Sequence, residues 1–135
     1  MRVLIDTNVL ISAILSPNST PFHAYVKATS YPYHAVICEQ NVVELQRIFQ
    51  KKFPQKLAAL EKFLSIALLT LEVIRIPEEK SIAEQLVRDK NDRPILRAAI
   101  QAKVDILVTG DKDFLESGID HPKAMTPAMF LQYHL

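Results

Sequence analysis

Acidic side chains follow two apolar segments of this chain. Asp6 comes directly after the largely apolar segment RVLI (residues 2–5), and both Asp111 and Asp113 come just after DILVT (residues 105–109), whose central residues are apolar. Carboxylates gathered at one place repel each other unless a divalent cation neutralises them. Oxygen ligands without cysteine or histidine favour Mg²⁺ or Mn²⁺ over zinc. These aspartates are therefore candidate metal ligands, provided that both segments end at the same edge of the molecule.

Two further carboxylates lie beside expected helices. Glu44 borders the apolar stripe of a helix predicted over residues 39–50, so its carboxylate should lie next to the core. Asp92 stands where the N-cap of a second helix belongs. The ordinary alternatives are a surface glutamate, capping aspartates and turn residues. Asp89 is interpreted as such a turn residue. If all the other carboxylates were ordinary surface, capping or turn residues, several negative charges would lie close together and repel one another. A bound divalent cation would neutralise this repulsion.

The elements that must position these residues alternate between strands and helices. Apolar runs predict strands over residues 2–5, 35–38, 72–76, 105–109 and, weakly, 123–126. Helical spacing and prolines predict helices over residues 8–15, 22–28, 39–50, 54–69, 77–88 and 95–102, and from residue 127 onward. This alternation is typical of an α/β fold whose parallel sheet is covered on both faces. Ligands of such sheets bind beyond the carboxyl ends of the strands, where Asp6 and Asp111 are expected.

The composition limits the possible classes of protein. The chain has 135 residues and only two glycines, without a Gly/Ser linker, so we expect one domain spanning residues 1–135. A net charge of +1 excludes binding of nucleic acid by bulk charge. The single cysteine, Cys38, is expected in the core and fits a reducing, cytoplasmic compartment. Asp6 interrupts the first apolar segment, unlike a secretory signal, and residues 63–74 are too short to span a membrane.

No histidine is expected to bind a metal ion together with these carboxylates. The four histidines are scattered, and none is assigned to a metal: His23, His34, His121 and His134. A carboxylate-held Mg²⁺ or Mn²⁺ is suited to hydrolysis of phosphodiesters, because it polarises the phosphate and activates water. Nothing in the sequence offers a covalent nucleophile with a paired base. The chemistry expected from these residues is therefore metal-dependent hydrolysis.

Four motifs, in this order, resemble those of a PIN domain: IDTNVLISAIL, VVEL, DKNDRPILRAAI and VTGDKDF. The branch of the family to which the chain is most similar is that of the toxin components of bacterial toxin–antitoxin systems. The similarity extends to TPAMFL near the end of the chain. The first and last motifs are fairly specific together, whereas VVEL alone means little. The resemblance implies a three-layer α/β/α sandwich with a central parallel β-sheet, and a Mg²⁺- or Mn²⁺-dependent ribonuclease site.

The resemblance also implies roles for individual residues. Its acidic quartet, which is both catalytic and metal-binding, falls on Asp6, Glu44, Asp92 and Asp111. Asp113 is a further candidate ligand, since the motif offers two aspartates. Asn8 matches an asparagine that orients the first aspartate, and Thr109 matches the hydroxyl residue that ends the fourth strand. Ser12, one turn after Asn8, is expected in the same polar network, although it also fits an ordinary exposed helix position.

Basic residues near the expected site are candidates for phosphate contacts. Arg93 and Arg97 share a face of the helix that Asp92 opens, and Lys112 lies between the two loop aspartates. Ordinary surface charge is the alternative for each of them. A denser basic patch is interpreted as a solvated face, or as a guide for RNA or an acidic partner: Arg47, Lys51, Lys52 and Lys56.

The leading hypothesis is a metal-dependent endoribonuclease that acts on RNA. The resemblance further implies a homodimer and a cognate antitoxin that covers the active-site cleft. The apolar residues between positions 53 and 71 offer a surface for either, with burial in the core as the first interpretation. The second hypothesis is a non-catalytic module that keeps the fold to bind RNA or protein. A third, chemistry through an aspartyl-phosphate, is disfavoured because IDTN lacks the second aspartate of a D-x-D-x-T motif.

Overall fold

The computed structural model describes residues 1–135 and contains a five-stranded sheet in which every pairing is parallel. The strands are β1 (Arg2–Ile5), β2 (His34–Cys38), β3 (Glu72–Ile74), β4 (Ile106–Val108) and β5 (Lys123–Met125). Their order across the sheet is β3-β2-β1-β4-β5. The chain therefore builds the sheet outward on one side of β1 and then returns to its other side. The carboxyl ends of β1 and β4 meet at this reversal, where α/β sheets bind their ligands.

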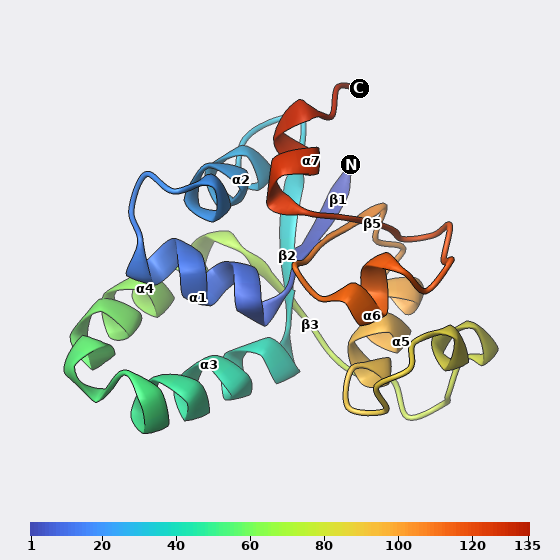
Figure 1. Ribbon diagram of the computed structural model, residues 1–135, viewed down its shortest axis with the longest axis horizontal. Helices are drawn as coiled ribbons and strands as arrows, with labels where there is room; N and C mark the ends of the chain where they lie inside the picture. The colour runs from blue at the N-terminus through green and yellow to red at the C-terminus, as the bar shows by residue number, and fades with distance from the viewer.

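Helices cover both faces of the sheet, as Figure 1 shows with the sheet seen nearly edge-on. One layer consists of α1 (Thr7–Leu15), α2 (Thr20–Ala28), α3 (Glu39–Lys52), α4 (Leu57–Thr70) and α7 (Pro127–Gln132). A short 3₁₀ turn, η1 (Pro54–Lys56), joins α3 to α4. The other layer consists of η2 (Ile82–Leu86), α5 (Arg93–Gln101) and α6 (Lys112–Leu115). The predicted three-layer α/β/α sandwich with a central parallel sheet is confirmed.

The central strands are buried on both faces, which explains their uninterrupted apolar sequences. Successive side chains of a strand point to opposite sides of the sheet. Val3 and Ile5 accordingly join the core under the larger helical layer, whereas Leu4 joins the core under α5. Cys38 lies in this second core and is fully buried. Burial raises the pKa of the Cys38 thiol, so this cysteine is a core residue as predicted.

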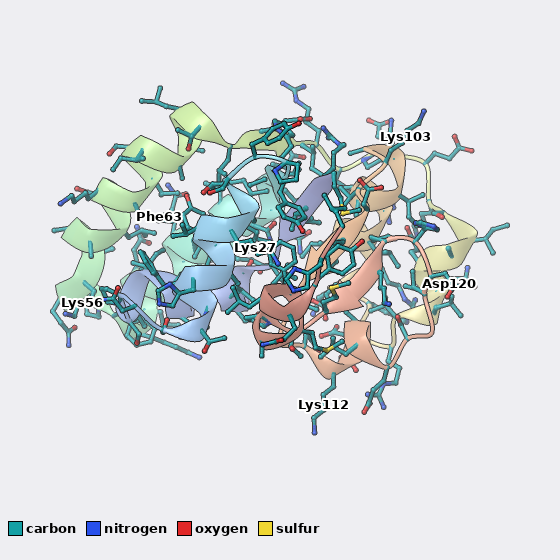
Figure 2. All side chains as sticks on the ribbon, turned by 90° about the horizontal axis from the view of Figure 1, so that it is seen from above. Lys27, Lys56, Phe63, Lys103, Lys112 and Asp120 are labelled. Carbon is teal, nitrogen blue, oxygen red and sulfur yellow. The ribbon has the colours of Figure 1, made fainter.

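A lysine of α2 forms hydrogen bonds with the C-terminal end of the last helix, α7. Lys27, labelled in Figure 2, donates hydrogen bonds from Nζ to the carbonyl oxygens of Phe130 and Tyr133, both at 2.6 Å. These carbonyls belong to the C-terminal end of α7, which carries the negative end of the helix dipole. The ammonium group also lies 4.7 Å from the centre of the Phe130 ring. This contact fixes the position of α7 at the edge of the larger helical layer.

The helix predicted over residues 77–88 is wrong. Only the 3₁₀ turn η2 forms there, and its residues Ile82 and Leu86 are 89 % and 53 % exposed. A regular helix is stabilised mainly by burying an apolar face, and these apolar side chains are not buried. Glu84 is instead turned inward, where its carboxylate accepts hydrogen bonds from Ser81 N–H and Arg97. The single turn of α6 was not predicted, because four residues are too few to show helical spacing.

The helices are also too short or too polar for a transmembrane role. None of them combines the length and the hydropathy that crossing a bilayer requires. The segment around residues 63–74 divides between α4 and β3. Its buried residues Leu64, Ala67 and Leu71 pack in the larger core, as the first interpretation of these apolar residues held.

Candidate functional site

Asp6 occupies the centre of the candidate site, between the end of β1 and the start of α1. Its Oδ1 accepts a hydrogen bond from Thr7 N–H at 2.8 Å. Its Oδ2 accepts from Thr109 Oγ1 at 2.8 Å and from Asn8 Nδ2 at 3.3 Å. Asp6 is only 5 % exposed, and this burial raises its pKa to about 6 although the hydrogen bonds from Thr109 and Thr7 favour the charged form. The charges of Glu44 and Asp111 contribute to the same rise.

The polar neighbours of Asp6 form hydrogen bonds that connect the end of β1 with the loop after β4. Asn8 accepts a hydrogen bond from Gly110 N–H through Oδ1, at 3.1 Å, while its amide nitrogen faces Asp6. Thr109, fully buried, accepts from Asp111 N–H at 3.0 Å and donates its own proton to Asp6. The structure thus places Asn8 and Thr109 around Asp6 and sets the position of Asp111. Asp111 in turn begins α6 and accepts from Asp113 N–H at 2.9 Å.

Glu44 reaches the site from the second turn of α3. Its Oε2 accepts a hydrogen bond from Thr7 Oγ1, and its Oε1 accepts from Gln40 Nε2, both at 2.8 Å. Gln40 Nε2 also lies 3.1 Å from the carbonyl oxygen of Asn91, the residue before Asp92. Glu44 is partly buried, as its place beside the apolar stripe predicted. Its carboxylate is therefore fixed between the end of β1 and the loop that leads to α5.

Asp92 has a buried carboxylate oxygen without a partner. Its Oδ2 is inaccessible and makes no hydrogen bond, and its side chain does not cap α5 although the residue stands at the N-cap position. Burial raises the pKa of Asp92, and the neighbouring carboxyl groups of Asp111, Asp89 and Asp6 raise it further. Without a cation, Asp92 therefore favours its protonated form. The capping alternative for Asp92 is not what the structure shows.

The tightest acidic group includes one residue that the sequence did not single out. Carboxylate oxygens of Asp89, Asp92 and Asp113 all lie within 4.8 Å of one another. Asp89 does act as a turn residue, since its Oδ1 accepts from Asn91 N–H at 2.9 Å, but its side chain also belongs to this group. Its spacing of three residues from Asp92 was the available signal.

The acidic residues fit a divalent cation. A cation next to Asp92 Oδ2 would supply the partner that this buried oxygen lacks, and it would relieve the repulsion that raises the pKa of Asp6 and of Asp92. All the candidate ligands are carboxylates, which is the donor set of Mg²⁺ and Mn²⁺ sites. Of the predicted quartet only Asp92 belongs to the close group with Asp89 and Asp113. Asp6, Glu44 and Asp111 lie near enough for their charges to act on one another or on Asp92.

Arg88 is a basic residue of this site that the sequence analysis missed. Its Nε and Nη2 lie 3.0 Å and 2.9 Å from Asp113 Oδ1, and its Nη2 lies 3.7 Å from Glu116. The Arg88 side chain is 73 % exposed. It precedes Asp89 in sequence, but its partners lie in α6, so only the fold reveals the pair. The guanidinium partly neutralises Asp113 in the absence of a metal.

The three basic residues proposed for phosphate contacts differ in how far they are engaged within the protein. The Arg97 guanidinium donates to both oxygens of Glu84 at 2.7 and 3.0 Å and to the carbonyl of Pro77. Both side chains of this ion pair are nearly buried, so most of the Arg97 guanidinium is turned to partners inside the protein. Arg93 donates from Nε to the carbonyl of Val87. Lys112 is exposed and points outward from α6 in Figure 2.

Ser12 does not join the polar network around Asp6. Its side chain is exposed and makes no hydrogen bond in the structure. It lines a small hollow of about 220 Å³ together with Asn8, Gly110 and Pro127. The ordinary helix position is therefore the better description of Ser12.

We expect Arg88→Gln to bind Mn²⁺ severalfold more tightly than the wild type. The substitution removes a positive charge that competes with a cation for Asp113. The effect should be modest, because pairs this exposed contribute at most about 1 kcal/mol. Isothermal titration with Mn²⁺ measures it, with Arg75→Gln as control, since Arg75 is exposed and forms no ion pair in the structure. Equal affinity of both variants would show that Arg88 does not influence the acidic site.

Comparisons with known proteins agree with this geometry. The sequence model of the family described as PIN domain matches residues 2–113. An uncharacterized protein of Methanocaldococcus jannaschii is 27 % identical, over 98 % of this chain and 90 % of that protein. The fold is similar to the crystal structure of VapBC2 from Rickettsia felis bound to a DNA fragment from their promoter, with a TM-score of 0.69 and 21 % identity.

A second similar fold is that of FitAcB from Neisseria gonorrhoeae, with a TM-score of 0.67 and 20 % identity. In both crystal structures the match covers 93 % of this chain and 98 % of the other. At such identities the likeness concerns the fold alone. The family match, by contrast, covers most of the sequence, including every residue of the acidic site. The chain therefore belongs to the PIN domain family.

Proposed function

We propose that this protein is a metal-dependent endoribonuclease that hydrolyses RNA phosphodiester bonds with Mg²⁺ or Mn²⁺. The observation that carries the proposal is the unpartnered, buried Oδ2 of Asp92 among the other carboxylates. A buried carboxylate oxygen costs free energy unless a donor or a cation satisfies it. Here the nearest charged groups are further carboxylates, whose charges act on Asp92 and raise its pKa. A divalent cation satisfies this arrangement, and a carboxylate-bound cation is suited to phosphodiester hydrolysis.

The contacts of each acidic residue indicate its role in the proposed site. A bound Mg²⁺ or Mn²⁺ supplies stabilisation of negative charge on the phosphate and makes water more acidic. Asp6 is held rigid by Thr7 N–H, Thr109 and Asn8, so it offers a carboxylate in a fixed place. Glu44 is held through both of its oxygens. Asp92 and Asp111 would hold the cation with their carboxylates, and in its absence burial raises the pKa of Asp92.

We assign the chain to the toxin side of a toxin–antitoxin system, with RNA as substrate and the cytoplasm as its compartment. The motifs support this assignment, since they resemble those of toxin components. The fold supports it as well, because it is shared with chains of the VapBC2 and FitAcB crystal structures. A cognate antitoxin and a homodimer belong to the same proposal. Co-expression with the reading frame adjacent to its gene, followed by co-purification, tests the antitoxin.

The direct test of the proposed function compares Glu44→Gln with the wild type on RNA. We expect the wild type to cleave RNA with Mn²⁺ and not with EDTA, and we expect Glu44→Gln to lose at least roughly 10-fold of this activity. Glutamine is nearly isosteric and keeps an acceptor for Thr7 Oγ1, so thermal unfolding in EDTA should change little. Glu61→Gln, on the exposed face of α4, is the matched control.

The outcomes separate the two leading hypotheses. Loss of cleavage at unchanged stability assigns chemistry to Glu44. A wild type that binds Mn²⁺ and RNA but leaves RNA intact contradicts the nuclease and favours the alternative, a non-catalytic PIN-fold module that binds RNA or protein.

A further inference from the structure

A buried chain of hydrogen bonds leads from the end of β2 to Glu44. Cys38 N–H donates to Asn41 Oδ1 at 2.9 Å, and Asn41 Nδ2 donates to Thr7 Oγ1 at 2.8 Å. Thr7 Oγ1 then donates to Glu44 Oε2, also at 2.8 Å. Asn41 is completely buried and Thr7 is 4 % exposed. Neither residue was singled out for chemistry in the sequence.

The direction of each hydrogen bond in this chain is fixed by the donors available. A backbone N–H can only donate, so the oxygen of the Asn41 amide must face Cys38. The amide nitrogen then faces Thr7, and because it can only donate, the Thr7 oxygen must accept from it. The Thr7 hydroxyl has a single proton, which is left for Glu44. Glu44 Oε2 therefore receives a hydrogen bond that fixes its position.

Helix capping explains only part of this arrangement. Asn41 is the third residue of α3, and its Oδ1 satisfies the backbone N–H of Cys38 as a capping box requires. Capping makes no use of the amide nitrogen, which is the group that contacts Thr7. Likewise, α1 needs no hydroxyl at Thr7, because Asp6 already caps that helix. Buried amide and hydroxyl groups cost free energy unless they are bonded, and here their remaining bonds all lead toward Glu44.

The second oxygen of Glu44 is also held. Gln40, one turn before Glu44 on α3, donates to Oε1 and contacts the carbonyl of Asn91. Each carboxylate oxygen has about two lone-pair positions, so one donor per oxygen leaves the other position open for a cation. Thr7 is thus the buried support of the Glu44 carboxylate, and Gln40 is its partly buried support.

We propose that Asn41 and Thr7 are positioning residues that hold the Glu44 carboxylate in the orientation that the metal ion needs. This inference rests on the proposed function, because it assumes that Glu44 is a metal ligand. Supports of this kind orient the ligand in metal sites, and their loss weakens metal binding or activity by roughly 10- to 100-fold.

The test measures Mn²⁺ affinity by isothermal titration, without RNA. Thr7→Val keeps the shape of the side chain and removes the hydroxyl, so we expect about 10-fold weaker binding. Thr7→Ser keeps the hydroxyl and should bind Mn²⁺ nearly as the wild type does. Asn41→Asp keeps the size of the side chain but replaces the donating nitrogen with an acceptor. The Thr7 proton then turns toward the new carboxylate, and Glu44 loses its donor, so Mn²⁺ affinity should again fall about 10-fold.

A double-mutant cycle with Glu44→Gln separates positioning from a general structural role. If Thr7 acts through Glu44, Thr7→Val should weaken Mn²⁺ binding little further in the Glu44→Gln background. Additive losses, or wild-type affinity of Thr7→Val and Asn41→Asp, would overturn the inference. Should Thr7→Val fail to fold in EDTA, Asn41→Asp carries the same cycle. A wild type that binds no Mn²⁺ overturns the inference and the metal site together. A wild type that binds Mn²⁺ without cleaving RNA contradicts only the proposed activity.

Discussion

Asp6→Asn should abolish metal-dependent cleavage of RNA while the protein stays folded. Asparagine keeps the size of the side chain and an acceptor for Thr7 N–H, but it lacks the charge at the centre of the site. Residues that merely support a metal ligand contribute roughly 10- to 100-fold, so loss of a direct ligand should cost at least on the order of 100-fold. The measurement is the rate of RNA cleavage in Mn²⁺ by purified variant and wild type.

The control for this variant is Asp120→Asn, at an exposed position after α6 that is not part of the close acidic group. It should cleave RNA as the wild type does. In EDTA near pH 8, Asp6→Asn should be at least as stable as the wild type, because burial disfavours the charged Asp6 carboxylate that the variant lacks. Cleavage within a few-fold of wild type by Asp6→Asn would exclude Asp6 as a metal ligand.

The second large effect is a loss of stability of the metal-free protein as the pH rises. The pKa of Asp6 is about 6 in the folded protein, against 3.8 for an ordinary aspartate. Between these two values the unfolded chain has released a proton that the folded protein retains, so the free energy of unfolding decreases with rising pH. This difference in pKa corresponds to roughly 3 kcal/mol once the pH exceeds the pKa of the folded protein. The raised pKa of Asp92 extends the decrease to higher pH.

Other carboxylates act in the opposite direction, but at lower pH. The hydrogen bonds from Arg2 and His34 lower the pKa of Glu72 to about 2, and the hydrogen bond from Arg97 lowers the pKa of Glu84. Their stabilising contributions are complete once the pH exceeds the ordinary glutamate pKa. Above about pH 5, a change in the free energy of unfolding, measured with denaturant in EDTA, therefore reports the carboxylates whose pKa is raised. A free energy of unfolding that rises steadily from about pH 5 to pH 8 would contradict the assignment.

Added Mn²⁺ should reverse this loss. A cation binds carboxylates in their charged form, so it stabilises the folded protein most at high pH. At a concentration 100-fold above the Kd the gain is about 3 kcal/mol, or on the order of 10 °C in Tm for a domain of this size. Asp6→Asn should show a much smaller gain. Identical melting curves of the wild type with EDTA and with millimolar Mn²⁺ would count against a metal site.

Several features of this protein follow from its sequence because they depend on neighbouring residues. The apolar runs at residues 2–5 and 35–38 mark strands buried on both faces, since no polar residue alternates with apolar ones. Asp6 and Asp111 come directly after central strands, and parallel strands all end at the same edge of the sheet. The fold class and the placement of Asp6 and Asp111 were therefore accessible from local sequence, whereas the quartet as a set came from the resemblance to the PIN domain.

The tertiary structure decided the features that depend on residues distant in sequence. The buried carboxylate of Glu84 is satisfied by Ser81 N–H and by the distant Arg97, and the 3₁₀ turn that carries it stands where a helix was predicted over residues 77–88. Arg88 contacts Asp113 because the fold places α6 beside Arg88. Asn41 met Thr7 only because β1 and β2 are adjacent and parallel, which brings the starts of α1 and α3 together. Local spacing determines which face a side chain occupies, whereas the partner on that face is set by the packing of the whole chain.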